Sequence, residues 1–197
     1  MLCMSKTLLK NNMKYENLAI RDVILIKPDV YEDPRGYFFE SFNSKKFNEL
    51  VGYDVSFVQD NHSFSKKGVL RGIHFQKNPH AQGKLVRVVT GEVFDVAVDL
   101  RKNSSTYGSW VGAHLSAKNN HQLWVPAGFG HAFLTLSDDV SFLYKTTNYY
   151  NKSSEESIIW NDKKINIDWP LNVIKNPYIS EKDDLAKTFE ESSESHF

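Results

Sequence analysis

The stretch Lys84-Leu-Val-Arg-Val-Val-Thr-Gly-Glu-Val-Phe-Asp-Val-Ala-Val-Asp99 decides the fold class of this chain. Apolar residues, most of them β-branched, fill the two runs Lys84–Val89 and Glu92–Asp99, and this composition is typical of strands. Thr90-Gly91 between the runs is a turn signal, because glycine adopts backbone conformations that side chains disfavour. The stretch therefore predicts two neighbouring β-strands joined by a tight turn.

Strand-like runs continue on both sides of this stretch. The further strands that we expect are Val23–Ile26, Gly36–Phe42, Trp110–Ser116, Gln122–Val125, Ala132–Leu136 and Val140–Thr147. Helical periodicity is found mainly in Ser44–Val51, and one more short helix is expected at Asp184–Phe189. Parallel βαβ units need helices between strands, which this pattern does not offer, whereas turn signals about ten residues apart are typical of sandwiches and barrels. The sequence therefore predicts an all-β fold, an antiparallel jelly roll with a few short helices.

Composition and charge narrow the classes of function. Hydrophobic residues make up 41% of the 197 residues and aromatic residues 13%, which is enough for a packed core and argues against disorder. Lys+Arg and Asp+Glu number 24 each, so the basic excess of a general nucleic-acid binder is missing. The single cysteine, Cys3, excludes an intramolecular disulfide, and no apolar run is long enough to span a membrane. We expect a cytoplasmic protein without nucleic-acid or membrane partners.

One domain with short extensions is expected. Residues 1–12 have no signal-peptide pattern and are predicted to be a flexible leader, with Met1 and Met13 as alternative starts of translation. Residues 13–189 are predicted to form the single jelly-roll domain, a length that suits one sizeable core. Residues 190–197 are rich in Glu and Ser, and we expect them to be a disordered tail.

The segment Val69–Gln76 carries the first candidates for chemistry. Strict alternation along a strand would place the side chains of Arg71 and His74 on opposite faces. A bulge at Gly72 would turn both side chains toward one site. A lone histidine on a strand is more often a hydrogen-bonded structural residue than a catalyst, so these residues alone leave both interpretations open.

Two other strands carry polar residues on faces that an apolar core would not choose. Lys84 shares a face with Val86 and Val88, which indicates either an amine that reaches a ligand or a strand-end lysine that extends to water. Four alternate residues combine phenols with polar groups: Tyr144, Thr146, Asn148 and Tyr150. That composition suits a barrel interior that holds a polar ligand, and it also suits a wet outer face.

The string Pro126-Ala-Gly-Phe-Gly-His131 matches the second half-motif of cupin jelly rolls, in which the histidine often binds a metal. The first half-motif needs His-x-His followed by a glutamate, whereas Phe75 and Gln76 follow His74 here. Three protein ligands are the usual minimum for a catalytic metal, and His74 and His131 are too few. We predict no metal and, because no Gly-rich dinucleotide motif is seen, no other cofactor.

The order of the motifs along the chain is more specific than any single motif. The strings concerned are Asp33–Ser41, Phe57–Ser63, Val69–Gln76, Gln82–Arg87, Gly91–Arg101, Leu123–Phe133, Phe142–Lys145, Asn148–Tyr150 and Ile159–Asp162. From about Val23 to Asp183 the chain closely resembles the dTDP-4-dehydrorhamnose 3,5-epimerase family of the cupin superfamily. The resemblance implies a homodimeric isomerase that epimerises C3 and C5 of a dTDP-4-keto-6-deoxyhexose, in dTDP-L-rhamnose and cell-surface polysaccharide biosynthesis.

The resemblance also assigns roles to the matching residues. It implies that His74 is the base, that Asp183 orients His74, and that Tyr144 returns a proton from the other face of the sugar. Lys84 matches the residue near the keto oxygen, and Tyr150 matches the aromatic residue that stacks on thymine. The other ligand-binding positions implied are Arg35, Glu40, Gln59, Asn61, Arg71, His131, Glu155 and Lys182. A histidine, with an ordinary pKa near about 6.5, suits proton removal beside a ketone.

Three alternative functions remain open from the sequence. The first is an epimerase that acts at C3 or C5 alone, or on another nucleotide-activated 4-keto sugar, because its motif residues would be nearly identical. The second is a sugar-binding jelly roll without catalysis, in which His74 and Tyr144 would be dispensable for solvent exchange. The third is a metal-dependent cupin oxygenase, which would contain bound iron.

Overall fold

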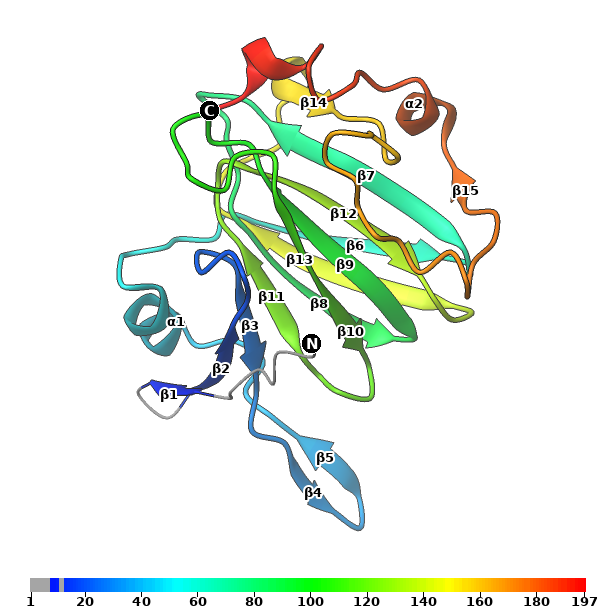
Figure 1. Cartoon of the computed structure of the whole chain (residues 1–197). Coiled ribbons are helices and arrows are strands. Elements are labelled where there is room, and N and C mark those ends of the chain that lie inside the picture. The colour runs from blue at the N-terminus through cyan, green and yellow to red at the C-terminus, as the bar shows by residue number, and fades with distance from the viewer. Residues whose placement is uncertain (1–7, 11–12) are drawn as a thin grey trace.

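Two sheets face each other and form the body of the molecule (Figure 1). The computed structural model describes residues 8–10 and 13–197. The seven-stranded sheet contains, in spatial order, β1 (Leu8–Lys10), β2 (Met13–Asn17), β3 (Ile24–Lys27), β11 (Gln122–Val125), β8 (Lys84–Thr90), β13 (Val140–Thr146) and β6 (Gln59–Ser65). The six-stranded sheet contains β10 (Trp110–Ser116), β9 (Glu92–Asp99), β12 (Phe129–Thr135), β7 (Val69–Gln76) and β14 (Glu155–Ser157), and β15 (Tyr178–Ile179) pairs with β7.

The strand pairings confirm the predicted antiparallel jelly roll, since β15 with β7 is the one parallel pairing among the described strands. The predicted turn between β8 and β9 is present at Gly91, whose φ of 79° is left-handed. Two expected strands differ in extent: the strand expected at Gly36–Phe42 ends at Phe38, and the strand expected at Ala132–Leu136 is Phe129–Thr135. In addition, Gln59–Ser65 form a strand that the sequence pattern did not predict. Apart from Phe64, residues 59–65 are all polar, so the run lacks the apolar face on which strand prediction relies.

Smaller elements complete the chain. The hairpin of β4 (Tyr31–Asp33) and β5 (Gly36–Phe38) projects from the body (Figure 1). The helical segments are α1 (Ser44–Val51), α2 (Glu181–Asp184) and the 3-10 turns Lys152–Ser154 and Ser193–Ser195. Helix α1 has the predicted bounds, since Asn43 caps its first turn and Gly52 ends it in a left-handed conformation. No helix within the described ranges is long and apolar enough to cross a membrane.

The last helix differs from its prediction. We expected it at Asp184–Phe189, but α2 begins at Glu181 and ends at Asp184. The reason is local, because the Ser180 hydroxyl accepts a hydrogen bond from the Asp183 amide and so caps a helix that starts earlier.

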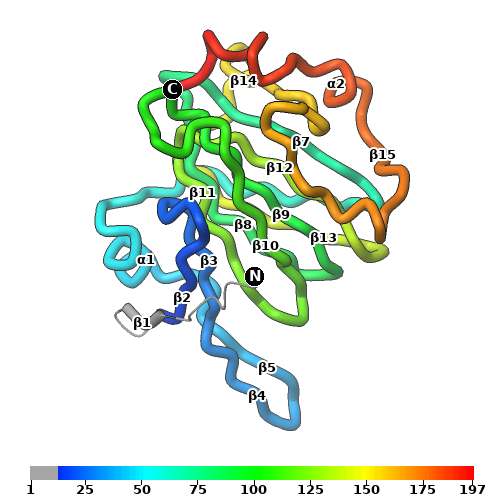
Figure 2. The backbone as a smooth tube through the Cα atoms, in the orientation of Figure 1, coloured from blue at the N-terminus to red at the C-terminus, as the bar shows by residue number. Residues whose placement is uncertain are grey.

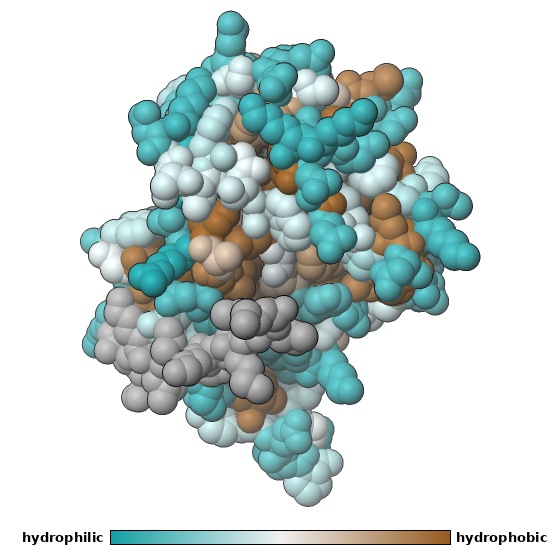
Figure 3. All heavy atoms as spheres, in the orientation of Figure 1, coloured by the Kyte–Doolittle hydropathy of each residue, from teal (hydrophilic) through white to brown (hydrophobic). Residues whose placement is uncertain are grey.

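Three apolar clusters show how the sheets are covered. The first lies between the sheets and contains Val86 and Phe142 from one sheet and Phe133 from the other, with the rings of Phe133 and Phe142 stacked at 4.3 Å. The second covers the outer face of the six-stranded sheet with chain that follows β14, and the third places α1 on the outer face of the seven-stranded sheet. The surface drawn in Figure 3 is mainly hydrophilic with separate apolar patches.

A bulge at Gly72 interrupts β7, as predicted. His74 pairs with His131 and Arg71 with Phe133, so three steps along β7 face two steps along β12. The extra residue turns Arg71 and His74 toward the same side of the sheet. A side chain at Gly72 is excluded, because its φ is +120° and an added Cβ would lie 2.5 Å from the Ala132 Cβ.

The end of the chain differs from the predicted disordered tail. Residues 190–197 lie near β7 and β14, at the end of the C-terminal segment that covers the six-stranded sheet (Figure 2). His196 is buried and its ring bonds to the Tyr107 hydroxyl at 2.6 Å and to Ser192 Oγ at 2.9 Å. Phe197 packs on the same apolar cluster and its amide donates to Leu100 O at 3.0 Å. Composition predicted solvation because it counts Glu and Ser, whereas the aromatic and histidine side chains determine the packing.

The predicted leader falls mostly outside the described residues, which leaves out 1–7 and 11–12. Its described part, Leu8–Lys10, is strand β1 and pairs with β2. The flexibility of the leader therefore stays a prediction.

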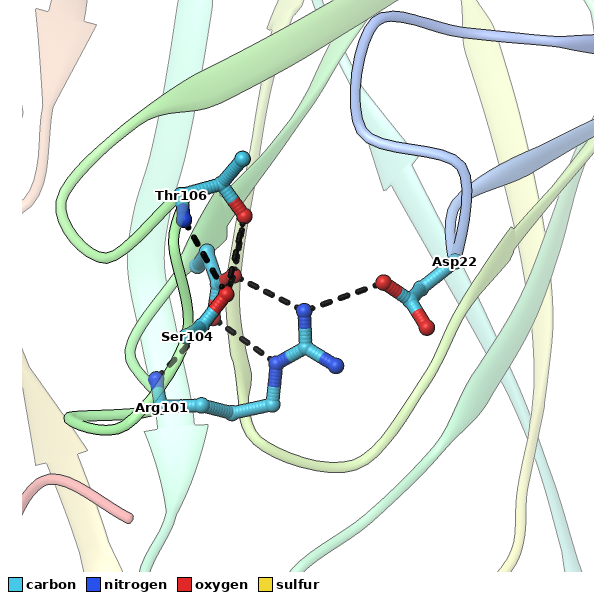
Figure 4. Close-up of polar contacts among 5 residues, drawn as sticks. Asp22, Arg101, Ser104 and Thr106 are labelled. Atoms are coloured by element: carbon cyan, nitrogen blue, oxygen red, sulfur yellow. Dashed lines mark hydrogen bonds and ion pairs between the residues drawn. The ribbon is translucent and has the colours of Figure 1, made fainter.

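A polar cluster fixes the end of β9 next to the N-terminal part of the chain (Figure 4). The fully buried Asp99 accepts hydrogen bonds from Arg101 Nε at 2.9 Å and Nη2 at 2.8 Å. The hydroxyls of Ser104 and Thr106 donate to the same carboxylate at 2.6 Å each. Arg101 also reaches Asp22, at 3.1 Å, just before β3. Burial raises the pKa of Asp99, but these donors outweigh burial and hold its pKa at about 2.

Candidate active site

His74 and Asp183 meet at the centre of the candidate site. His74 lies on β7 and Asp183 in α2, 109 residues further along the chain, and His74 Nε2 is 2.6 Å from Asp183 Oδ1. The Asp183 side chain is only 4% exposed, whereas that of His74 keeps 31%. Because the carboxylate occupies Nε2, Nδ1 is the ring nitrogen that can exchange a proton with a ligand.

The bulge and α2 hold the Asp183 carboxylate in place. The Gly72 amide donates to Oδ2 at 3.3 Å, and the Ser180 hydroxyl accepts from the Asp183 amide at 3.2 Å. Burial raises the pKa of Asp183, but the hydrogen bonds from His74, Gly72 and Ser180 outweigh burial and leave the pKa below its usual value. Asp183 is therefore a carboxylate at neutral pH, and its hydrogen bond to Nε2 fixes the orientation of the His74 ring.

Lys84 and Tyr144 belong to the opposite sheet. Lys84 begins β8, and its Nζ donates to the His74 carbonyl oxygen at 3.4 Å, which links the two sheets. Burial lowers the pKa of Lys84 to about 8, although Asp95 and Glu155 oppose this effect. Tyr144 on β13 packs against the core between the sheets, and burial raises the pKa of its phenol. At neutral pH Lys84 is mostly cationic and Tyr144 is protonated.

Arg71 lies on the other side of the bulge from His74. Its Nε donates to Ser65 Oγ at 3.2 Å, across to the edge strand β6 of the opposite sheet. Its charge also lowers the pKa of the Tyr144 phenol, though burial has the larger, opposite effect. The guanidinium thus stands between the two sheets, close to Tyr144.

A second histidine–carboxylate pair lies beside His74. His131 on β12 pairs in register with His74, and His131 Nε2 is 3.0 Å from both carboxylate oxygens of Asp95. Asp95 is fully buried, and burial raises its pKa against the influence of His131. Asp95 was not among the residues expected from the sequence, although a signal was present. Asp95 shares a strand face with Val93 and Ala97, and a carboxylate on an apolar face needs a partner.

Five of the predicted ligand-binding residues form a connected group, called here the rim: Gln59, Asn61, Tyr150, Glu155 and Lys182. Gln59 Nε2 donates to Asn61 Oδ1 at 2.9 Å, and Gln59 Oε1 accepts from the Tyr150 amide at 3.1 Å. The Tyr150 hydroxyl donates to Glu155 Oε2 at 3.1 Å, and Lys182 Nζ is 2.7 Å from Glu155 Oε1. The rim therefore joins β6, β14 and α2.

Glu155 connects the rim to the His74 pair. Burial raises the pKa of Glu155, but Lys182, Tyr150 and His74 lower it more, and the pKa lies below its usual value. Lys182 also directly precedes Asp183 in α2. The structure thus brings the rim and the His74 pair into one continuous site.

The predicted polar face from Tyr144 to Tyr150 is correct only in its first half. Strand β13 ends at Thr146, which is buried and donates its hydroxyl proton to the Asn148 carbonyl at 2.9 Å. Alternation stops there, and Tyr150 lies in an irregular segment with 52% exposure. Tyr150 joins the site through its own hydrogen bonds and not through the parity of the strand.

Two predicted ligand-binding residues lie away from this site. Arg35 is in the turn of the β4–β5 hairpin, where its side chain is 89% exposed and pairs with Asp33. Glu40 pairs with Lys46 at 2.8 Å and lines a pocket on the outer side of the seven-stranded sheet. Within the described part of a single chain, neither Arg35 nor Glu40 reaches the His74 pair.

The site histidines bond to carboxylates. Across residues 8–10 and 13–197, no group of three or more His, Cys, Asp or Glu side chains is arranged to hold a metal ion. A reaction without metal or other cofactor stays a prediction, which metal analysis and a chelator test would check.

A sequence model of the dTDP-4-dehydrorhamnose 3,5-epimerase family matches residues 17–191. The chain belongs to this family. The dTDP-4-dehydrorhamnose 3,5-epimerase of Shigella flexneri is 58% identical over 170 residues, which cover 86% of this chain and 92% of the relative. The ordered motifs of the sequence therefore identified the family correctly.

Solved structures of epimerases are similar to this chain in fold and in sequence. The dTDP-6-deoxy-D-glucose-3,5-epimerase of Legionella pneumophila, in complex with dTDP-4-keto-L-rhamnose, is 48% identical, with a TM-score of 0.87 over 90% of this chain and 93% of that one. A 3'-monoepimerase from Streptomyces bikiniensis, in complex with dTDP-quinovose, is 33% identical, with a TM-score of 0.84 over 90% of this chain and 88% of that one. Proteins that share this fold thus include a single-site epimerase.

Proposed function

We propose that this chain is an isomerase that epimerises C3 and C5 of dTDP-4-dehydro-6-deoxy-glucose to give dTDP-4-dehydro-L-rhamnose, without a cofactor. The observation that carries the proposal is His74, which is held by the buried Asp183 at 2.6 Å and linked to Lys84 of the opposite sheet. Membership of the epimerase family supports the choice of substrate. The enzyme then acts in the cytoplasm, in dTDP-L-rhamnose and cell-surface polysaccharide biosynthesis.

The chemistry follows from the ketone at C4 of the sugar. Removal of a proton from C3 or C5 leaves an enolate, whose charge is centred on the C4 oxygen. His74 Nδ1 takes the proton, and Asp183 stabilises the imidazolium that forms. The Lys84 ammonium stabilises the enolate oxygen, an effect that is worth roughly 3–4 kcal/mol for one good donor. Tyr144 returns a proton to the opposite face of the ring, which inverts the carbon.

The rim suits the nucleotide half of the substrate. The half-exposed ring of Tyr150 offers a stacking surface for thymine, and the side-chain amides of Gln59 and Asn61 offer hydrogen-bonding groups. The Arg71 guanidinium, which bonds to Ser65 of β6, suits a phosphate oxygen pair of the diphosphate. We place His131 against the sugar, because His131 pairs in register with His74.

A homodimer gives Arg35 and Glu40 a role in ligand binding. The projecting hairpin exposes Tyr31, Tyr37 and Phe38 at 65%, 59% and 71%, and exposed aromatic residues that cluster on one arm are typical of an interface. We propose that the hairpin docks on a second subunit and brings Arg35 and Glu40 to that subunit's rim. In a two-fold dimer both sites are completed in the same way.

Deuterium uptake from heavy water tests the proposed reaction. The protein is incubated with dTDP-4-dehydro-6-deoxy-glucose in heavy water, and label at each carbon is read by NMR. Label at both C3 and C5 is the expected result. Label at C3 alone would identify a single-site epimerase, the alternative that the Streptomyces bikiniensis neighbour favours. No label at either carbon would indicate a binding protein without catalysis.

A further inference from the structure

Gln76, the last residue of β7, is buried and bonds to the backbone on both sides of Tyr150. Gln76 is 5% exposed. Its Oε1 accepts a hydrogen bond from the Asn151 amide at 2.6 Å, and its Nε2 donates to the Tyr149 carbonyl at 3.2 Å. The two backbone groups that Gln76 holds are therefore those that flank Tyr150.

The same side chain also binds the loop that follows β7. Gln76 Nε2 donates a second hydrogen bond, to the His80 carbonyl at 2.9 Å, so both amide protons are used. The ring of His80 in turn lies 3.2 Å from the side-chain amide nitrogen of Asn151. One buried amide thus joins the end of β7, this loop and the segment that carries Tyr150.

This arrangement matters because nothing regular holds the Tyr150 segment. Residues 149–151 lie between β13 and β14, outside helix and strand, so no sheet ladder fixes their backbone groups. Backbone N–H and C=O groups need hydrogen-bond partners, and at Asn151 and Tyr149 the Gln76 side-chain amide supplies them. The Tyr150 amide itself donates to Gln59 Oε1 at 3.1 Å. The side chains of Gln59 and Gln76 together therefore hold the backbone from which the Tyr150 ring projects.

We propose that Gln76 is a positioning residue for nucleotide binding, which fixes the backbone around Tyr150 so that its ring is presented to the base of dTDP. The inference rests on the proposed nucleotide site at the rim. Gln76 lies two residues beyond His74 on the same strand and in register with Glu155. Strand β7 therefore carries both His74, the proposed catalytic base, and the residue that positions the nucleotide. The effect falls on binding of the nucleotide and not on proton transfer.

Calorimetric titration of the full chain with dTDP measures this role directly. Gln76→Met keeps the length of the side chain and removes all three hydrogen bonds, and we expect the Kd for dTDP to rise about tenfold. In turnover, KM should rise by a similar factor while kcat stays within about twofold. Gln76→Glu keeps the acceptor oxygen and removes both donors. It replaces Gln76→Met in the titration if thermal unfolding shows that Gln76→Met is not folded. The expected direction of change is the same.

A double-mutant cycle with Tyr150→Ala separates positioning from general loosening. If Gln76 acts through the Tyr150 ring, then Gln76→Met in the Tyr150→Ala background should change the Kd for dTDP by less than about twofold. Gln82→Met is the matched control, because Gln82 Nε2 donates a single hydrogen bond to the Asn148 carbonyl of the same segment at 2.7 Å. We expect Gln82→Met to leave the Kd within about twofold.

Several outcomes would overturn the inference. These are additive losses in the cycle, an equal loss in Gln82→Met, or a Gln76→Met protein whose kcat falls while its Kd for dTDP is unchanged. A Tyr150→Ala protein that binds dTDP normally would also overturn it. The titration needs no turnover, so a wild-type protein that binds dTDP but shows no epimerisation would refute the proposed reaction and leave the Gln76 result readable.

Discussion

At the scale of single residues, the Asp183 carboxylate contacts two parts of the site. Its carboxylate bonds to His74 Nε2 and to the Gly72 amide, so it sets both the tautomer of the histidine and the shape of the bulge. Asp183→Asn keeps the size of the side chain and removes the charge that stabilises the imidazolium. We expect kcat to fall by about 10²-fold or more with KM little changed, measured by steady-state assay. An unchanged kcat would contradict the assigned role.

The pKa of Lys84 predicts how kcat/KM changes at alkaline pH. Its pKa of about 8 means that the ammonium needed at the enolate oxygen is present below pH 8 and is lost as the pH rises through this value. The kcat/KM of the wild-type protein should therefore fall above about pH 8. Lys84→Met should lower kcat/KM by about 10²–10³-fold and abolish this fall. A fall near pH 8 that persists in Lys84→Met would assign it to another group.

Sequence reasoning works best for features that a contiguous motif encodes. A bulge at Gly72 was expected between Arg71 and His74, and the register of β7 against β12 shifts there. The contact of Asp183 with His74 spans 109 residues, and no local pattern encodes it. Asp95 was missed, since its partner His131 lies on a different strand and only the packed sheet brings the two together.

At the scale of elements, the predicted strands follow from apolar periodicity, and the errors occur where that signal is absent. Strand β6 has polar and small residues because one face lines the site, and the sequence pattern did not identify it. The C-terminal segment looked solvated by composition, yet His196 and Phe197 pack on the outer sheet face. Burial against a distant element, which depends on the whole fold, decides both cases.

The Asp99 cluster predicts a stability effect at the end of β9. Asp99→Ala should lower the free energy of unfolding by about 3 kcal/mol, because it leaves the partly buried Arg101 without its main partner. Asp22→Ala, which removes an exposed partner of Arg101, should cost less than about 1 kcal/mol. Urea unfolding at neutral pH measures both values, and equal small losses would contradict the account.

The same cluster gives a pH dependence whose sign is fixed. The folded-state pKa of Asp99, about 2, lies below the ordinary value near about 3.9. Its contribution is therefore present above pH 4 and is lost as the pH falls from about 4 toward 2. The difference in unfolding free energy between wild type and Asp99→Ala should shrink over this range, and a difference that grows in acid would be the opposite result.

At the scale of the whole molecule, two predicted ligand-binding residues, Arg35 and Glu40, lie apart from His74 within the single chain. Sequence motifs list the residues of a site without saying which subunit supplies them. If the chain forms the homodimer proposed above, light scattering should give the mass of two chains. Tyr37 and Phe38 are exposed on the hairpin. When both are replaced by serine, light scattering should give the mass of one chain.

Mixing two inactive variants tests whether the hairpin acts on the partner. Arg35→Ala and His74→Asn each impair both sites of their own dimers. When the two are unfolded, mixed equally and refolded together, half of the dimers are hybrids with one intact site. Activity should then recover to about a quarter of the wild-type value, as expected for random pairing in a two-fold dimer. No recovery, with hybrids confirmed by mass, would place Arg35 outside the partner's site.

The most direct test of the central claim is solvent exchange by His74→Asn, because the account makes His74 the group that removes the protons. Wild-type protein and His74→Asn are incubated with dTDP-4-dehydro-6-deoxy-glucose in heavy water, with dTDP affinity measured as the control for an intact rim. We predict that His74→Asn binds dTDP as wild type does and incorporates no deuterium at C3 or C5. Exchange at either carbon at a rate near that of the wild type would contradict the account.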